Sequence, residues 1–144
     1  MPVVYHNLRL NSMLILLRCS LVQYAAECWP WSSRDAVSAR QAVLGAAAEQ
    51  TTLVEQMAAL LTDRGWSIDP GAYPEEFTDW NFVSLRYLWP RVIEDQEFVV
   101  AELAEAAHEC VDDRQGTRLL TAARDSQRLI LEGLRAASAS VSAS

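Results

Sequence analysis

The sequence predicts an all-α protein built as a four-helix bundle. Apolar residues recur at helical spacing through most of the 144 residues, and no strand-like alternation persists. Proline and glycine divide this pattern into four long amphipathic segments. Apolar residues make up 51% of the chain against 22% charged residues, a composition typical of one folded domain. Long amphipathic helices in a chain of this size bury their apolar faces by packing as a bundle.

The first helix is expected over residues 5–28 and the second from about residue 32 to Gly65. The first ends at Trp29-Pro30-Trp31 because proline cannot continue the hydrogen-bond ladder. Ser32 and Asp35 resemble a capping box at the start of the second helix, and Gly65 is a natural helix stop. The apolar stripe of the first helix consists of Leu10, Met13, Leu14, Leu17, Leu21, Tyr24 and Ala25.

The second half of the chain predicts a long connection and two further helices. Residues 65–77 form the connection, and Thr78 or Asp79 caps a helix that runs through residue 89. Pro90 either kinks this helix or divides it, and the apolar stripe continues to residue 111. A turn at 112–116 leads to the last helix. Residues 1–135 are expected to form one domain, and the Ala/Ser-rich residues 136–144 a disordered tail.

The topology depends on the connection at 65–77. A second helix of about 30 residues is roughly 45 Å long, and thirteen extended residues span at most about 43–47 Å. The connection alone could barely cross the bundle, although a separate short helix at 78–89 would make the crossing easy. A bundle with one crossover and a plain up-down-up-down bundle both remain open at this point.

Composition argues against several classes of partner. The net charge of −7 argues against a nucleic-acid binder, which needs a basic face to displace phosphate counterions. No apolar run approaches the roughly 18–20 residues of a membrane span, and no signal peptide is visible. The three widely spaced cysteines fit a reducing cytoplasm. The aromatic residues gather in the two loops and before Pro90, where they either plug the bundle ends or form a homodimer face.

Three segments carry a resemblance to a known family. They are Leu-Val-Gln-Tyr at 21–24, Phe-Thr-Asp at 77–79 and Leu-Trp-Pro-Arg-Val-Ile-Glu-Asp-Gln at 88–96. Together they resemble small bacterial ferritin-like proteins of unassigned activity, over residues 5–135. The resemblance implies a ferritin-like four-helix bundle with one long connection between the second and third helices and a short or kinked helix before Pro90.

A working di-iron site in such a bundle needs a carboxylate from each of two helices and a Glu-x-x-His from each of the other two. The sequence departs from this pattern, because Glu49 is followed at i+3 by Thr52 and Asp125 by Arg128. Only two histidines occur, and both His6 and His108 are expected at exposed helix ends. We therefore expect no bound metal, with iron as the alternative. If a metal is bound, the candidate ligands are Glu49, Glu94, Asp95, Glu105, His108 and Asp125.

Three amides interrupt otherwise apolar stripes where the metal would lie. Gln50, Gln96 and Gln127 fall on the second, third and fourth helices, and Tyr24 on the first could add a hydroxyl. A buried amide without partners costs about 1–3 kcal/mol, so these side chains are expected either to form a hydrogen-bonded core layer or to reach solvent at the stripe edges.

The sequence favours a non-catalytic role. It contains no nucleophile elbow and no phosphate-binding glycine loop. The preferred interpretation is a metal-free structural or protein-interaction module in the cytoplasm, as a homodimer or with an unknown protein partner, and without nucleic-acid or membrane partners. The alternatives are an iron-binding protein or oxidase with a non-standard ligand set, and a bundle that binds a small ligand in its core.

Overall fold

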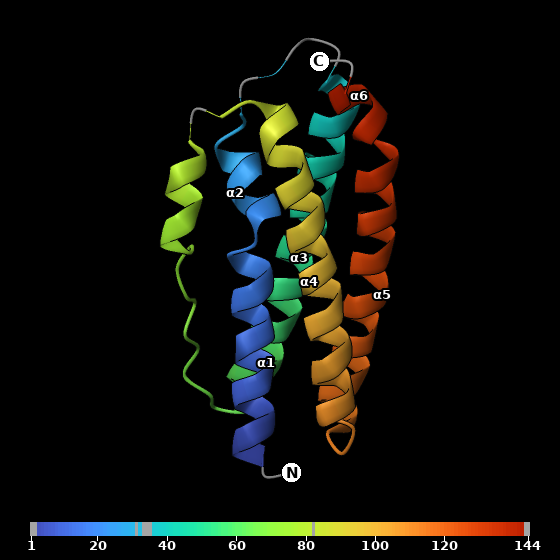
Figure 1. Ribbon diagram of the computed structural model, residues 1–144. Coiled ribbons are helices and arrows are strands. Elements are labelled where there is room, and N and C mark those ends of the chain that lie inside the picture. Colours follow the sequence, from blue (N-terminus) through green and yellow to red (C-terminus); the bar gives the residue numbers. More distant parts are fainter. Residues whose placement is uncertain (1–2, 31, 33–35, 82, 143–144) are drawn as a thin grey trace.

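A computed structural model describes residues 3–30, 32, 36–81 and 83–142, and this part of the chain is all-α, as predicted (Figure 1). It contains no β-strand. The elements are α1 (Val3–Arg18), α2 (Leu21–Glu27), α3 (Val37–Asp63), a 3₁₀ helix η2 (Glu75–Trp80), α4 (Leu85–Glu109), α5 (Arg114–Ala136) and a short α6 (Ser138–Ser142).

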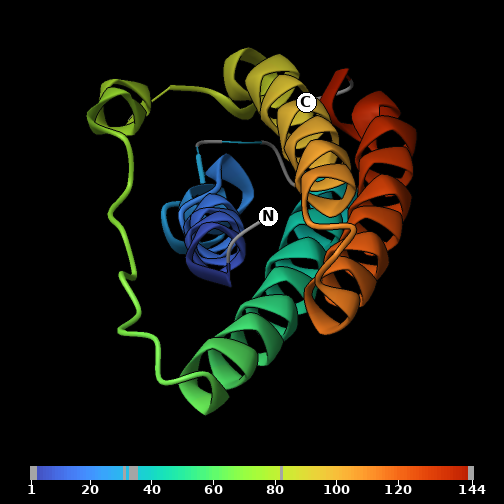
Figure 2. The same ribbon diagram turned by 90° about the horizontal axis from the view of Figure 1, so that it is seen from below.

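The long helices lie side by side, and one connection runs along the outside of the molecule. Helices α1 and α2 follow one another along one line, and α3 runs back beside them. The chain then climbs past α1 and α2 through η2, so that α4 runs in the same direction as α3 (Figure 1). Figure 2 shows this connection on the outer side of α1, across from α5.

The prediction of one continuous helix over 5–28 is wrong, because the helix breaks at Cys19 and Ser20. Ser20 has extended backbone angles, and its Oγ accepts a hydrogen bond from the Gln23 N–H at 3.2 Å, so it caps α2. Leu17 and Leu21 are both buried on either side of the break. The apolar stripe therefore continues across the break, which explains why periodicity alone did not reveal it.

Helix α3 begins at Val37, later than predicted, and no side chain among the described residues caps its start. The proposed capping box is not tested, since Asp35 lies outside the described residues. The predicted stop is present: Gly65 has a φ of +71°, and the N–H of Trp66 donates to the carbonyl of Leu61 at 3.0 Å. This is the hydrogen-bond pattern with which glycine commonly ends a helix.

The predicted helix from residue 78 through Trp89 is also wrong. Residues 75–80 form the 3₁₀ helix η2, and α4 starts later, capped by Ser84, whose Oγ accepts from the Tyr87 N–H at 3.2 Å. Pro90 lies inside α4, which is one helix from Leu85 to Glu109. Because Pro90 falls in the second turn, its missing N–H costs only a ladder bond near the helix start.

The expectation of a disordered tail differs from the structure over residues 138–142, which form α6. Val141 is 3% exposed and belongs to the core. The indole N–H of Trp89 donates to the Ser138 Oγ at 3.1 Å, which fixes α6 against α4. The Ala/Ser composition hid this contact because a single valine provides the apolar anchor.

The core consists of two apolar clusters, one toward each end of the long helices. One cluster holds residues of α2 and the start of α3 and α4, such as Val43 and Val92. The other holds residues of α1 and the later turns of α3 and α4, such as Met57 and Val99. The clusters meet where α3 and α4 carry Gln50 and Gln96, so a polar layer separates the two halves of the core.

Candidate functional site

The three predicted glutamines lie together at the centre of the molecule. Gln50, Gln96 and Gln127 are each 0% exposed. The Gln50 Nε2 donates to the Gln127 Oε1 at 3.0 Å and to the Gln96 Oε1 at 3.4 Å. The Gln96 Nε2 donates to the Gln127 Oε1 at 2.9 Å and to the Gln127 backbone carbonyl at 3.0 Å. These amides, which we call the amide layer, join α3, α4 and α5.

The break between α1 and α2 completes the amide layer from the fourth side. The Ser20 hydroxyl donates to the Gln50 Oε1 at 2.8 Å. The Gln23 Nε2 donates to the same oxygen at 3.2 Å and to the Ala47 carbonyl at 2.7 Å. Ser20 thus caps α2 and also binds the central amide. Neither Ser20 nor Gln23 was among the residues predicted for the layer.

The amide layer can organise the core but has little chemistry of its own. Amides and a serine hydroxyl remain neutral at ordinary pH and supply no general acid or base. The polar groups of the layer hydrogen-bond mainly to one another, whereas the Gln127 Nε2 has no protein partner in the described part of the chain. The layer therefore holds four helical segments in one register.

Tyr24 lies outside the amide layer, contrary to the prediction. Its hydroxyl donates to the Asn81 side chain, just after η2. Its ring packs edge-on against Tyr73 with centroids 5.3 Å apart, and against Phe77 at 5.5 Å. Tyr24 therefore attaches the outer connection to α2. The aromatic residues were expected either to plug the bundle ends or to form a homodimer face. Tyr24, Tyr73 and Phe77 follow the first alternative, because they fill space beneath the connection.

The six candidate metal ligands are not brought together. Glu49, Glu94, Glu105, His108 and Asp125 are exposed, and only Asp95 is half-buried. The Asp95 Oδ2 accepts the backbone N–H of Leu21 at 3.0 Å, at the start of α2. In the described part of the chain, no three His, Cys, Asp or Glu side chains are grouped so that they could hold a metal ion. The side chains at the centre that could coordinate a metal ion are neutral amides, so the residues present do not fit a di-iron centre.

Asp95 is a carboxyl group in a poorly hydrated place. Burial raises its pKa, the hydrogen bond from Leu21 opposes that shift, and the neighbouring charge of Glu76 adds to it. The place of Asp95 on the third helix predicts it as a candidate ligand. Its partner at the α2 N-terminus could not be predicted, because that helix start was itself missed.

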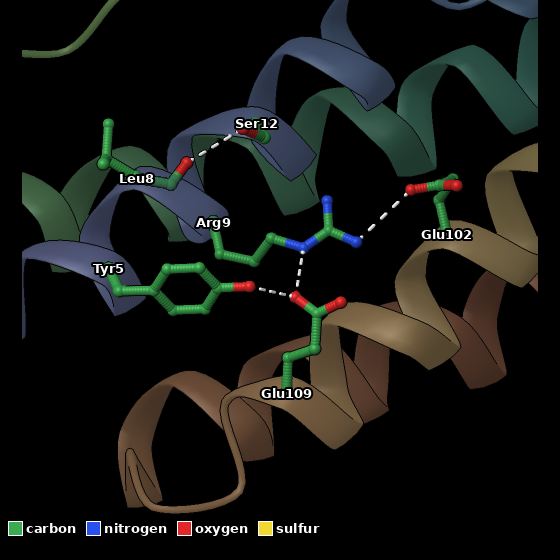
Figure 3. Close-up of polar contacts among 6 residues, drawn as sticks. All are labelled: Tyr5, Leu8, Arg9, Ser12, Glu102 and Glu109. Carbon is green, nitrogen blue, oxygen red and sulfur yellow. Dashed lines mark hydrogen bonds and ion pairs between the residues drawn. The ribbon is translucent and has the colours of Figure 1, made fainter. Parts of the chain in front are cut away.

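A polar cluster missed by the sequence analysis joins α1 to α4. Arg9 lies between two carboxylates of α4, with its Nε 2.9 Å from Glu109 and its Nη2 3.3 Å from Glu102 (Figure 3). The Tyr5 hydroxyl donates to the same Glu109 oxygen (Figure 3). These bonds, led by the one from Tyr5, lower the pKa of Glu109. None of these residues stands out in the sequence by itself, and no spacing in the sequence predicts that residues 5 and 109 lie close together.

The prediction of an exposed His6 is wrong. His6 is 5% exposed, and its Nε2 has no hydrogen-bond partner among the described residues. It lines a surface hollow with Arg64 and Asp113. The prediction failed because α1 begins at Val3, so residue 6 already lies within the bundle.

Comparisons with protein-family models, with curated proteins and with solved structures find no match to this chain. No helix in the described ranges is both long enough and apolar enough to cross a membrane.

Proposed function

We propose that this chain is a metal-free helical-bundle protein whose activity is binding rather than catalysis. The observation that carries the proposal is the amide layer. The polar groups at the centre form hydrogen bonds mainly with one another, and these bonds link four helical segments. A core of this kind provides a rigid scaffold, and its outer faces are then left for recognition.

We propose a cytoplasmic location, because the three cysteines are free thiols, as a reducing compartment would keep them. We further propose that the bundle is ferritin-like. The support is the course of the chain: α3 and α4 run in the same direction and are joined by a connection along the length of the molecule (Figure 1). A ferritin-like bundle with one crossover has this course. The amides then stand where such bundles carry carboxylate and imidazole ligands.

The outer faces carry apolar side chains that a partner could cover. Val4 and Leu8 of α1, Phe98 of α4 and Leu129 of α5 are each more than half exposed. Val4 and Leu8 lie one helical turn apart and so share a face of α1, and a contiguous exposed apolar patch marks an interaction surface. A homodimer is the partner we propose first.

Metal loading and mass determination test the proposal together. Protein purified without chelator or affinity tag is incubated anaerobically with ferrous iron, desalted and submitted to elemental analysis. We expect no stoichiometric iron and no oxygen consumption on exposure to air. Light scattering after gel filtration should give twice the chain mass of 16.1 kDa.

Two irons per chain, the content of a di-iron site, together with oxygen consumption would contradict the binding role and favour an oxidase. A monomer mass would exclude the homodimer and leave a different partner.

A further inference from the structure

A cleft on the outer surface lies between η2, the start of α2 and the middle of α4. Its apolar lining includes Trp80 of η2 and Phe98 of α4. Phe98 is 53% exposed, and Trp80 is half-buried. The Trp80 ring stacks on Phe77 with centroids 5.6 Å apart and an interplanar angle of 28°. Phe77 packs in turn on Tyr24, so the aromatic wall of the cleft is fixed from behind.

Three carboxylates share this cleft. Glu76 comes from η2, and Glu94 and Asp95 from α4. None of them forms an ion pair within the residues that the structure describes. Asp95 is the innermost, and its Oδ2 is held by the Leu21 N–H. Glu76 and Glu94 are exposed, whereas Asp95 is half-buried, so a cation in the cleft would balance the one carboxylate that is partly removed from water.

One cation already lies at the edge of the cleft. The Arg91 guanidinium stacks over the Tyr87 ring at 3.9 Å and lies 6.0 Å from the centre of the Trp80 ring. Its Nη1 donates to the Tyr87 carbonyl at 2.9 Å, so Arg91 is engaged on its own helix. A cation can therefore approach the face of the Trp80 ring. The cleft is lined by one positively charged side chain and three negatively charged side chains.

We propose that this cleft binds an alkylammonium group. Aromatic faces attract a cation through their negative quadrupole, and the effect is strongest where water is displaced. The Asp95 carboxylate would accept the ammonium N–H groups, while Trp80 and Phe98 would cover the alkyl chain. The ammonium group could belong to a free diamine or to a lysine of a different protein, since both present the same chemistry and this chain contains no lysine.

This proposal gives the binding role a ligand class, and it rests on that role. The two can fail separately, because the iron assay decides between binding and metal chemistry. A titration of the cleft decides only which chemical group it accepts.

The test is an NMR titration that follows the indole N–H signal of Trp80. The probes are 1,4-diaminobutane, with 1,4-butanediol as its uncharged control, and acetyl-Gly-Lys-Gly-amide, with its Nε-acetylated form as control. We expect saturable shifts with a charged probe, at a Kd of about 1 mM or tighter, and no comparable shifts with the controls. Tighter binding of the diamine indicates a free ligand, and tighter binding of the peptide indicates a protein partner.

Variants locate the effect in the cleft. Asp95→Asn keeps an oxygen for the Leu21 N–H but removes the charge, and it should weaken binding about tenfold, as expected for loss of a charged hydrogen bond. Phe98→Ala, at an exposed position, should weaken binding as well. Arg91→Gln should strengthen binding because it removes a competing positive charge. Glu55→Gln makes the same charge change as Asp95→Asn on an exposed part of α3 and should leave binding unchanged.

The proposal is overturned if neither charged probe gives a saturable shift at Trp80. It is also overturned if 1,4-butanediol shifts the signal as much as the diamine, or if Glu55→Gln weakens binding as much as Asp95→Asn. The last result would show that only the overall negative charge of the protein attracts the probe.

Discussion

At the scale of single residues, Gly71 shows how the outer connection is fitted to α1. Its φ is +70°, and a Cβ there would stand 2.5 Å from the Cγ2 of Ile15. Beside it, the Asn11 amide donates to the Asp69 carbonyl at 2.8 Å and accepts the Asp69 N–H at 3.0 Å. Only glycine combines this backbone angle with so close an approach.

Gly71→Ala should therefore destabilise the protein by about 1–3 kcal/mol, the cost of holding a non-glycine residue in the left-handed region. The matched control is Gly45→Ala, inside α3, where nothing lies within 4 Å of the added carbon. That change should stabilise the protein by about 1 kcal/mol, since alanine favours helix. Urea unfolding measures both, and equal effects of the two changes would contradict the tight fit at Gly71.

The sequence predicts the central amides but few of their partners. Each glutamine interrupts an apolar stripe, so its position on the buried face could be predicted from helical period. Ser20 and Gln23 join the layer only because α1 breaks, and that break leaves the stripe intact. Tyr24 was placed in the layer because its helix was expected to be continuous, whereas α2 holds it against the connection.

At the scale of elements, an ion pair fixes the end of α3 to the turn before α5. The Arg64 Nη1 and Nη2 lie 2.8 and 2.7 Å from the two carboxylate oxygens of Asp113, and Nη1 also donates to the Asn7 Oδ1 at 2.9 Å. Asp113 also caps α5, because its Oδ1 accepts the Gly116 N–H at 3.0 Å. The Arg64–Asp113 ion pair, together with the hydrogen bond to Asn7, thus joins α1, α3 and α5.

This pair should give stability that disappears in acid. The hydrogen bonds from Arg64 lower the pKa of Asp113 below its ordinary 3.8. The folded state therefore holds fewer protons on Asp113 than the unfolded state. The contribution is present above the ordinary pKa and is lost as pH falls through the lowered folded pKa.

Arg64→Met should cost about 1–3 kcal/mol at neutral pH, since the partner carboxylate is left largely buried and unpaired. The cost should shrink below about pH 4 as Asp113 is protonated. Arg124→Met, which removes an ion pair with the exposed Asp125, is the control and should cost at most about 1 kcal/mol at any pH. A cost for Arg64→Met that stays constant from neutral to acid pH would contradict this role of the pair.

Element boundaries were the least predictable part of the fold. The stop at Gly65 carries a specific backbone signal and was placed well. The start of α4 was misplaced because Thr78 and Asp79 are plausible caps, yet Ser84 is the residue whose hydroxyl binds the first turn. That choice depends on how Tyr24 and Asn81 hold the preceding segment, which involves contacts across the chain.

At the scale of the whole molecule, the amide layer divides one core into two apolar halves. The long helices and the outer connection could be predicted from period and length, and the all-α class is confirmed. The division of the core could be predicted only in part, because it needs all three amides to reach the same level of the bundle. The structure places them there and adds the break between α1 and α2 as the fourth side.

The free energies of unfolding of Gln50→Leu, Gln96→Leu, Gln127→Leu and the triple variant show whether the three amides act as one hydrogen-bonded layer. Gln50 has partners on three other helical segments, so Gln50→Leu should cost about 1–3 kcal/mol by leaving them unsatisfied. Gln127→Leu should cost less, because the Gln127 Nε2 already lacks a partner among the described residues. The triple variant should cost clearly less than the sum of the three single changes, because it removes donors and acceptors together. Three additive costs would contradict the claim that the amides form one hydrogen-bonded layer.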